Sequence, residues 1–333
     1  MRRTVLQIAG GGARRRLPFF RSSAPSSSSC SSSFSSSSSS PLPSTTETKI
    51  REQTHATIKG RKRFYKQVGV REVAVAAAAA TTTTKGEEEG EALFEVTLDG
   101  RALRSPGRRN MHFANEAMAC ALALEWDAQV SARGIEPSTM PLMSLVSTWL
   151  DQTDQGRDEV IRNVSKYLFT DTACFYAEPE LRVLLNRQRK AFRGLHEWME
   201  DEWDAPLATT DSVFKLKHPP GSVARVAAMV DALDGPALTA LQCATMESKS
   251  LVIGLALVLR RITPRVAEEA SRLEEEFQME QWGLVEGGHD MDIVAGRVNM
   301  ASASAFLHLL DGLDGHEKRL QRIKAALAEV ADK

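Results

Sequence analysis

The alternation of apolar and polar residues separates a short strand-forming stretch from a long helical one. Residues 63–68 are rich in aromatic and β-branched side chains, and residues 93–98 form a second such run. That run ends at Asp99-Gly100, a strong turn dipeptide, and residues 102–103 can return as a third strand. Beyond this hairpin the apolar residues recur at helical spacing. The pattern predicts an α+β fold, with a small β-rich N-terminal domain followed by a larger all-helical C-terminal domain.

Helical spacing first appears near Asn115, which can cap a helix within residues 113–130. That helix would carry one apolar face made of Ala117, Ala121, Leu124 and Ala128. Glycine and proline separate most of the segments that follow. The further helices that we expect cover residues 141–153, 157–169, 180–203, 221–233, 236–260, 264–282, 290–310 and 315–330.

The first 46 residues differ in composition from the rest of the chain. They contain six arginines and no acidic residue, and 16 serines lie between Ser22 and Ser44. This composition is typical of an organellar transit peptide, although a plain disordered tail would share it. We therefore expect a disordered organellar transit peptide over 1–46, for which composition alone leaves mitochondrion and plastid both open. A linker over 47–60, a β-rich domain over 61–112 with a low-complexity insert over 73–91, and a helical domain over 113–333 should follow.

Charge and hydropathy argue against two classes of partner. The chain has 42 Lys+Arg against 43 Asp+Glu, so its net charge is -1 and no basic excess indicates nucleic acid. The longest uncharged apolar run outside the N-terminal segment is 251–259, which is shorter than the roughly 20 residues that a membrane span needs. We expect no nucleic-acid partner and no membrane span.

Sequence motifs that carry chemistry are absent. There is no phosphate-binding G-x-x-x-x-G-K-S/T loop, no G-x-S-x-G nucleophile elbow and no H-E-x-x-H zinc helix. These motifs therefore mark no catalytic residue, no cofactor contact and no metal ligand in the sequence.

One acidic stretch, residues 273–292, places carboxylates near a face that should be buried. The apolar stripe that precedes it at helical spacing consists of Val266, Ala270, Leu273 and Phe277. Glu280 occupies the next position of this stripe, and Glu274 lies at its edge. Because a buried carboxylate is costly unless it is paired, Glu280 requires an explanation.

Three interpretations of Glu280 are open. It can form an internal pair with an arginine or with backbone donors of a neighbouring helix. It can belong to a metal-dependent hydrolase, whose ligands for a hard cation would be Glu280, Glu286, His289, Asp290 and Asp292. Asp290 can equally cap the next helix, whose apolar stripe would be Val294, Val298, Ala301, Ala305 and Leu309. Finally, the acids and Trp282 can form a recognition surface for a partner protein.

Short blocks spread along the body occur in a characteristic order. They are Leu98-Asp99-Gly100-Arg101-Ala102-Leu103 with Ser105-Pro106, Glu125-Trp126-Asp127-Ala128-Gln129, Met140-Pro141-Leu142, Thr170-Asp171-Thr172, Lys249-Ser250-Leu251, and the stretch from Leu273 to Asp292. Together they resemble the mitochondrial F1-ATPase assembly chaperones that bind the alpha subunit. The similarity covers residues 64–310, and neither the insert at 73–91 nor the serine tract touches a matching block.

The resemblance implies a chaperone of the mitochondrial matrix, and not an enzyme, that holds the newly imported F1 alpha subunit until it is assembled. It implies further that the transit peptide over 1–46 is mitochondrial. It also implies a β-rich N-terminal and a helical C-terminal domain, in agreement with the residue pattern. We expect a monomer in which Glu274, Glu280 and Trp282 form or support the client-binding surface. The alternatives are a metal-dependent hydrolase that uses the acids of 280–292 and a generic helical scaffold with unrelated partners.

Overall fold

The structure, a computed structural model, describes residues 60–74, 92–130, 134–212, 216–312 and 314–331. All of these belong to one compact unit that extends from Glu47 to Lys333. The predicted transit peptide over 1–46, the linker up to residue 59 and most of the predicted insert lie outside the described residues. Their assignments therefore stay predictions.

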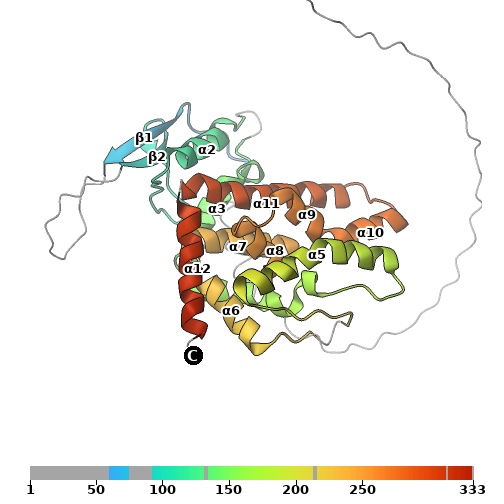
Figure 1. Cartoon of the computed structure of the whole chain (residues 1–333). Coiled ribbons are helices and arrows are strands. Elements are labelled where there is room, and N and C mark those ends of the chain that lie inside the picture. The colour runs from blue at the N-terminus through green and yellow to red at the C-terminus, as the bar shows by residue number, and fades with distance from the viewer. Residues whose placement is uncertain (1–59, 75–91, 131–133, 213–215, 313, 332–333) are drawn as a thin grey trace, which may run out of the picture. The chain divides into compact units, whose positions relative to one another are not determined.

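A three-stranded antiparallel sheet forms the N-terminal part of the described chain (Figure 1). Its strands are β1 (Val68–Ala74), β2 (Ala92–Leu98) and β3 (Arg101–Ala102), in the order β1-β2-β3. Val68 pairs with Leu98, and Leu98 pairs with Arg101 across the Asp99-Gly100 turn. The predicted strand at 93–98 and its hairpin are confirmed.

The first strand begins later than predicted, at residue 68 rather than 63. The backbone N–H groups of Lys66 and Gln67 donate to the carboxylate of Asp99, at 3.0 and 2.9 Å, instead of joining the sheet. The strand also continues through residues 73–74, which were predicted to belong to the insert. Long-range bonds to a turn residue thus shift this strand along the chain.

Helix α2 (Glu116–Asp127) packs against β1 and β2. Its start is confirmed, because the side chain of Asn115 accepts a hydrogen bond of 3.0 Å from the N–H of Ala117. Its predicted apolar face is wrong: Leu124 is exposed, and the residues buried against the core are Met118, Ala119, Leu122 and Trp126. Both faces of this helix are apolar, so periodicity alone could not choose between them.

Further helices complete the fold (Figure 1). They are α3 (Pro141–Thr148), α4 (Arg157–Lys166), α5 (Arg182–Trp203), α6 (Pro220–Asp231), α7 (Gly235–Ser248), α8 (Leu251–Val258), α9 (Pro264–Ser271), α10 (Leu273–Trp282), α11 (His289–Asp311) and α12 (Gly315–Ala331). A π-helical turn, Trp149–Thr153, continues α3, and short 3₁₀ turns at Pro137–Thr139, Tyr167–Thr170 and Thr172–Cys174 link several of the helices.

Two segments predicted as single helices are each divided in two. The 236–260 segment breaks at Lys249, which has a left-handed φ of 54°, and Ser250 then caps α8 by accepting the N–H of Ile253. The 264–282 segment breaks at Arg272, where φ is -108° and ψ is 9°. A one- or two-residue break changes the direction of a helix while leaving the apolar spacing on either side intact.

Helix α8 forms the centre of the core. All eight of its residues are buried, and it contacts α5, α7, α9 and α11. Gly254 permits the close approach of α7, since a Cβ at this position would lie 2.5 Å from Oγ1 of Thr245. The nine-residue apolar run noted in the sequence is therefore a core helix.

Among the described residues, α11 has the length and composition that a membrane-spanning helix would need. Core helices pass the same test, and α11 packs along α7 and α9 with Met300, Phe306 and Leu307 buried. The helix begins at His289, and Gly288, not Asp290, occupies its N-terminal cap position. The absence of a membrane span stays a prediction.

The fold class agrees with the predicted α+β arrangement, in which a small sheet is followed by a mostly helical region. Helix α2, which the prediction assigned to the helical domain, covers the sheet. The predicted boundary between residues 112 and 113 stays a prediction.

Candidate functional site

Glu280 lies on the exposed side of α10 and not in the core. Its carboxylate accepts two hydrogen bonds of 2.9 Å from the guanidinium of Arg187 on α5. This bond lowers the pKa of Glu280. A pair with an arginine of a neighbouring helix, one of the three interpretations, is thus present, but the predicted burial is wrong, because the Glu280 side chain is 53% exposed.

The buried carboxylate of this region is Glu268 on α9, which the sequence analysis did not identify. It lies 3.7 Å from Nε of Arg272 and 3.5 Å from Nε of Arg297. The helix break at Arg272 separates its face from that of α10, so a stripe extrapolated through the break reaches the wrong residue. The Glu268–Arg272 spacing of four is the sequence signal that could have indicated this pair.

Glu274 is also attached to α5. Its carboxylate accepts a hydrogen bond of 2.9 Å from Nε2 of Gln188. Gln188 is fully buried, and its side-chain oxygen accepts the N–H of Ala177 at 2.7 Å. Because α10 has no fully buried residue, these polar bonds to α5 are an important part of what holds α10 in place.

Trp282, the last residue of α10, is 79% exposed. It begins a series of exposed apolar side chains that continues through the connecting loop and along one side of α11. We call this series the α10–α11 apolar surface; it comprises Trp282, Leu284, Val285, Met291, Val294 and Val298. Val294 and Val298 belong to the stripe predicted to be buried, and that prediction is wrong, since α11 packs through its other side.

The acids of 280–292 do not form a metal site. Within the described ranges, no group of three or more His, Cys, Asp or Glu side chains is placed to hold a metal ion. Glu280 is bonded to Arg187, and Nδ1 of His289 accepts the N–H of Val285 at 3.3 Å. The structure thus does not bring the candidate ligands of the hydrolase interpretation together.

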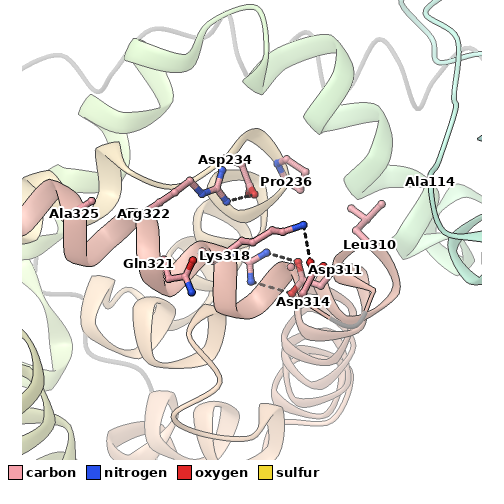
Figure 2. Close-up of a pocket in the computed structure, with 12 residues that line it drawn as sticks. Ala114, Asp234, Pro236, Leu310, Asp311, Asp314, Lys318, Gln321, Arg322 and Ala325 are labelled. Carbon is pink, nitrogen blue, oxygen red and sulfur yellow. Dashed lines mark hydrogen bonds and ion pairs between the residues drawn. The ribbon is translucent and has the colours of Figure 1, made fainter. Parts of the chain in front are cut away.

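A pocket of about 780 Å³ lies where α11 turns into α12 (Figure 2). Its charged side chains satisfy one another in three ion pairs, Arg322 with Asp234, Arg319 with Asp311, and Lys318 with Asp314. The first two join α12 to the start of α7 and to the end of α11. The ion pairs therefore account for the charged side chains that line this pocket.

The blocks that carry the family resemblance bond to one another. Glu125 on α2 accepts the N–H groups of Leu142 and Met143, both at 2.8 Å, and so caps the start of α3. Burial raises the pKa of Glu125 to about 7. Two blocks separated in the sequence therefore meet at a helix terminus, where orphan donors need an acceptor.

Asp171 has the same role at α8. Its carboxylate is fully buried and accepts the N–H groups of Ala173 and Val252, at 3.0 and 2.9 Å. Thr172 donates from its hydroxyl to the carbonyl of Ser248 at 3.1 Å. The Thr170-Asp171-Thr172 block thus holds the Lys249-Ser250-Leu251 block at the break between α7 and α8.

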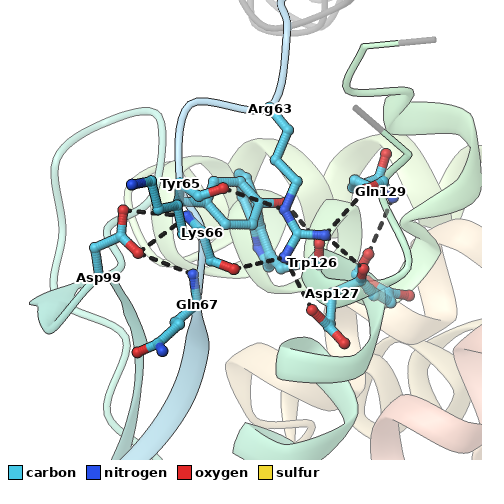
Figure 3. A network of polar contacts seen from close by, with 9 residues as sticks. Arg63, Tyr65, Lys66, Gln67, Asp99, Trp126, Asp127 and Gln129 are labelled. Atoms are coloured by element: carbon cyan, nitrogen blue, oxygen red, sulfur yellow. Dashed lines mark hydrogen bonds and ion pairs between the residues drawn. The ribbon is translucent and has the colours of Figure 1, made fainter. Parts of the chain in front are cut away.

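A third group of contacts ties the start of the described chain to the end of α2 (Figure 3). The hydroxyl of Tyr65 donates to the carbonyl of Trp126 at 2.6 Å, and their rings pack edge to face. The guanidinium of Arg63 reaches Asp127 and the carbonyl of Gln129. Trp126 is buried in this arrangement.

Comparisons with known proteins agree with these observations. The family model described as ATP12 chaperone protein matches residues 62–200. The Schizosaccharomyces pombe protein named atp12, mitochondrial, is 25% identical over 242 residues, which is 69% of this chain and 81% of that protein. The Saccharomyces cerevisiae protein named ATP12, mitochondrial, is 26% identical over 255 residues, covering 63% of this chain and 78% of that one.

A solved structure extends the similarity to the fold. The crystal structure of Atp12 from Paracoccus denitrificans matches with a TM-score of 0.62 and 31% identity, over 75% of this chain and 98% of that one. Nearly the whole bacterial protein is thus covered by the sheet and helices described above. The chain belongs to the ATP12 chaperone family, and it is a mitochondrial F1-ATPase assembly chaperone and not an enzyme.

Proposed function

We propose that this chaperone binds the unassembled F1 alpha subunit in the mitochondrial matrix and that the α10–α11 apolar surface is its client-binding surface. The observation that carries the proposal is the succession of exposed large apolar side chains from Trp282, 79% exposed, through the loop to Met291, 63% exposed, and Val294, 57% exposed. Exposed apolar patches of this kind mark sites of protein interaction. A chaperone needs such a patch to cover the apolar interface of a subunit that awaits its partner.

Acidic residues surround this surface. Glu286, Asp290 and Asp292 are exposed between the apolar positions of the loop and of the first turn of α11. A polar rim around an apolar centre is the usual anatomy of a reversible interface. The arrangement favours a client surface that combines apolar and basic side chains.

Glu274 and Glu280 have a supporting role in this proposal. Both carboxylates hold α10 against α5, through Gln188 and Arg187 respectively. We therefore assign the direct contact to Trp282 and the positioning of α10 to the two glutamates. This refines the expectation that all three residues form or support the surface.

Localisation to the matrix is supported by two facts. The arginine-rich, acid-free composition of residues 1–46 is that of a transit peptide, and the yeast relatives are named as mitochondrial proteins. Fusion of residues 1–46 to a reporter should deliver it to a compartment that resists protease until both mitochondrial membranes are opened. A reporter that stays outside mitochondria would contradict this assignment.

The test of the client surface is co-purification of the alpha subunit with surface variants. Replacing Trp282 and Val294 by serine should weaken binding by tenfold or more, because burying an aromatic and an aliphatic side chain contributes about 1.5–3 kcal/mol each. Leu124→Ser is the matched control, since Leu124 is equally exposed on α2, far along the chain from this surface. Undiminished binding by folded Trp282 and Val294 variants would reject the surface, and co-purification of beta alone would reject the client.

The positioning role has its own test. Glu280→Arg alone should weaken client binding because α10 loses its bond to α5, and adding Arg187→Glu should restore both the bond and the binding. If the double variant binds no better than Glu280→Arg, Glu280 acts as a contact residue instead.

A further inference from the structure

A second concave site lies at the other end of the described chain, at the edge of the sheet. It is a pocket of about 500 Å³ whose apolar lining comes from Phe64, Leu98, Ala102 and Leu103. Strand β3 is the outer strand on this side of the sheet, so the pocket opens beside a strand edge. None of its lining residues belongs to the α10–α11 apolar surface.

The aromatic wall of this pocket is held rigidly. Phe64 is 68% exposed although it is a large apolar side chain. Its ring packs edge to face on Tyr65, with the centroids 5.3 Å apart. Tyr65 is itself buried and anchored through its hydroxyl to the carbonyl of Trp126. Figure 3 shows Tyr65 next to Trp126 at the end of α2. The exposed ring of Phe64 is thus held in place by an anchored neighbour, which suits it to contact a partner.

The rim of the pocket is positively charged. Arg101 and Arg104 line it and are exposed, and neither forms an ion pair with any residue that the structure describes. The one acid in the lining, Asp99, uses its carboxylate to accept the N–H groups of Lys66 and Gln67. Asp99 keeps its negative charge, but no ion pair joins it to either arginine, so the lining holds two cationic side chains against one anionic side chain.

The neighbouring loop adds to this charge and is itself rigid. Asp151 accepts the hydroxyl of Ser105 at 2.6 Å and the N–H of Gly107 at 2.8 Å. The loop carries Arg108, which is exposed and has a left-handed φ of 65°, and Arg109, whose Nε lies 3.7 Å from Asp151. The bonds to Asp151 fix the backbone of this loop, and Arg108 adds an exposed cationic side chain four residues after Arg104, while Arg109 is paired with Asp151.

We propose that this pocket binds an acidic segment of a partner protein, with one apolar side chain against Phe64 and flanking carboxylates on Arg101 and Arg104. Charge complementarity selects the partner, since Arg101 and Arg104 form no ion pair among the described residues and are free to bind carboxylates. The apolar lining selects a protein segment over a polyanion such as nucleic acid, which would leave Phe64 and Leu103 without apolar contact. The site goes beyond the proposed client surface and does not rest on it.

The test is fluorescence anisotropy of the full chain with a labelled nine-residue peptide that has leucine at its centre and two glutamates on either side. Replacing both Arg101 and Arg104 by alanine should weaken binding roughly tenfold, as expected for the loss of two partly exposed ion pairs. Arg182→Ala is the matched control, because Arg182 is also exposed and lies on α5. A peptide with serine in place of leucine should lose a similar factor, as should Phe64→Ser.

Charge reversal keeps the proposal falsifiable if binding is weak. Arg101→Glu with Arg104→Glu should reject the acidic peptide and accept a peptide in which lysines replace the glutamates. Equal binding of a glutamine-substituted peptide, wild-type binding by the folded alanine variant, or stronger binding of an oligonucleotide or of anionic vesicles would each overturn the proposal.

Discussion

Replacing Asp171 by asparagine should remove a pH dependence of stability that this one carboxylate creates. Asp171 is fully buried at the junction of α7 and α8, where it accepts the N–H groups of Ala173 and Val252. Burial raises its pKa from 3.8 to about 6, and the hydrogen bonds from Ser250 and from the backbone oppose this without outweighing it. Asparagine has nearly the same size and does not titrate.

The raised pKa of Asp171 determines whether its contribution to stability rises or falls with pH. Because the pKa of Asp171 is higher in the folded chain than in the unfolded one, the folded state binds the proton more tightly. The stability contributed by this proton is complete below about pH 3.8 and is lost as the pH rises through about 6. At about 1.4 kcal/mol for each tenfold change in the ionisation constant, the total is about 3 kcal/mol. Roughly 2 kcal/mol of this falls between about pH 4.5 and 7.5.

Asparagine also introduces an effect that does not depend on pH. Its side chain has one acceptor oxygen where the carboxylate has two, so one buried N–H loses its partner at a cost of about 1–3 kcal/mol. The absolute stability of the variant is therefore a poor measure of the charge. The change with pH in the difference between wild type and variant isolates the titration of Asp171.

The assay is urea unfolding of the purified chain, followed by tryptophan fluorescence at several pH values from about 4.5 to 7.5. The free energy of unfolding of the wild type should fall by roughly 2 kcal/mol relative to Asp171→Asn as the pH rises over this range. A difference that stays constant with pH would refute the inference that burial dominates the ionisation of Asp171.

Three other substitutions test the contacts that define the fold. Glu125→Ala leaves two N–H groups at the start of α3 without an acceptor, and it should lower the free energy of unfolding in urea by about 1–3 kcal/mol; an unchanged midpoint would show that α3 needs no cap. Lys249→Gly removes the strain of a left-handed φ of 54° and should raise the thermal midpoint by a few degrees, corresponding to about 1 kcal/mol. A lower midpoint would instead assign a structural role to the lysine side chain. Trp126→Arg buries a charge between α2 and the sheet and should abolish the cooperative fold seen by circular dichroism; a soluble, folded variant would contradict the structural role of Trp126.

Features encoded by adjacent residues were predictable. The Asp99-Gly100 turn specifies the hairpin between β2 and β3, and Asn115 marks the start of α2. The blocks shared with the family could also be recognised as a set from the sequence, although the sequence did not show what each block does in the structure. Glu125 accepts donors 17 and 18 positions away, and Asp171 accepts one 81 positions away in addition to the N–H of Ala173, so no local pattern could show that they cap α3 and α8.

Errors arose where a pattern was extended beyond its element. The stripe through Val266 and Phe277 was continued to Glu280 as if α9 and α10 were one helix, and the break at Arg272 made that continuation invalid. The candidate site was affected in the same way. The sequence placed Glu274, Glu280 and Trp282 in one stretch, but it could not indicate that the two glutamates bond to α5 while Trp282 faces solvent.

The sequence by itself determined the α+β class, most of the helical segments, the hairpin turn and the family, because helical spacing, turn dipeptides and ordered blocks depend on residues close together in the chain. The tertiary structure alone decided which side of each apolar helix is buried. Helices α2 and α11 are apolar on more than one side, and the side that faces the core is the one against which β2, α7 or α9 can pack. The apolar side left over on α11 is part of the surface that we propose for the client, so the position of that proposed surface is set by long-range packing.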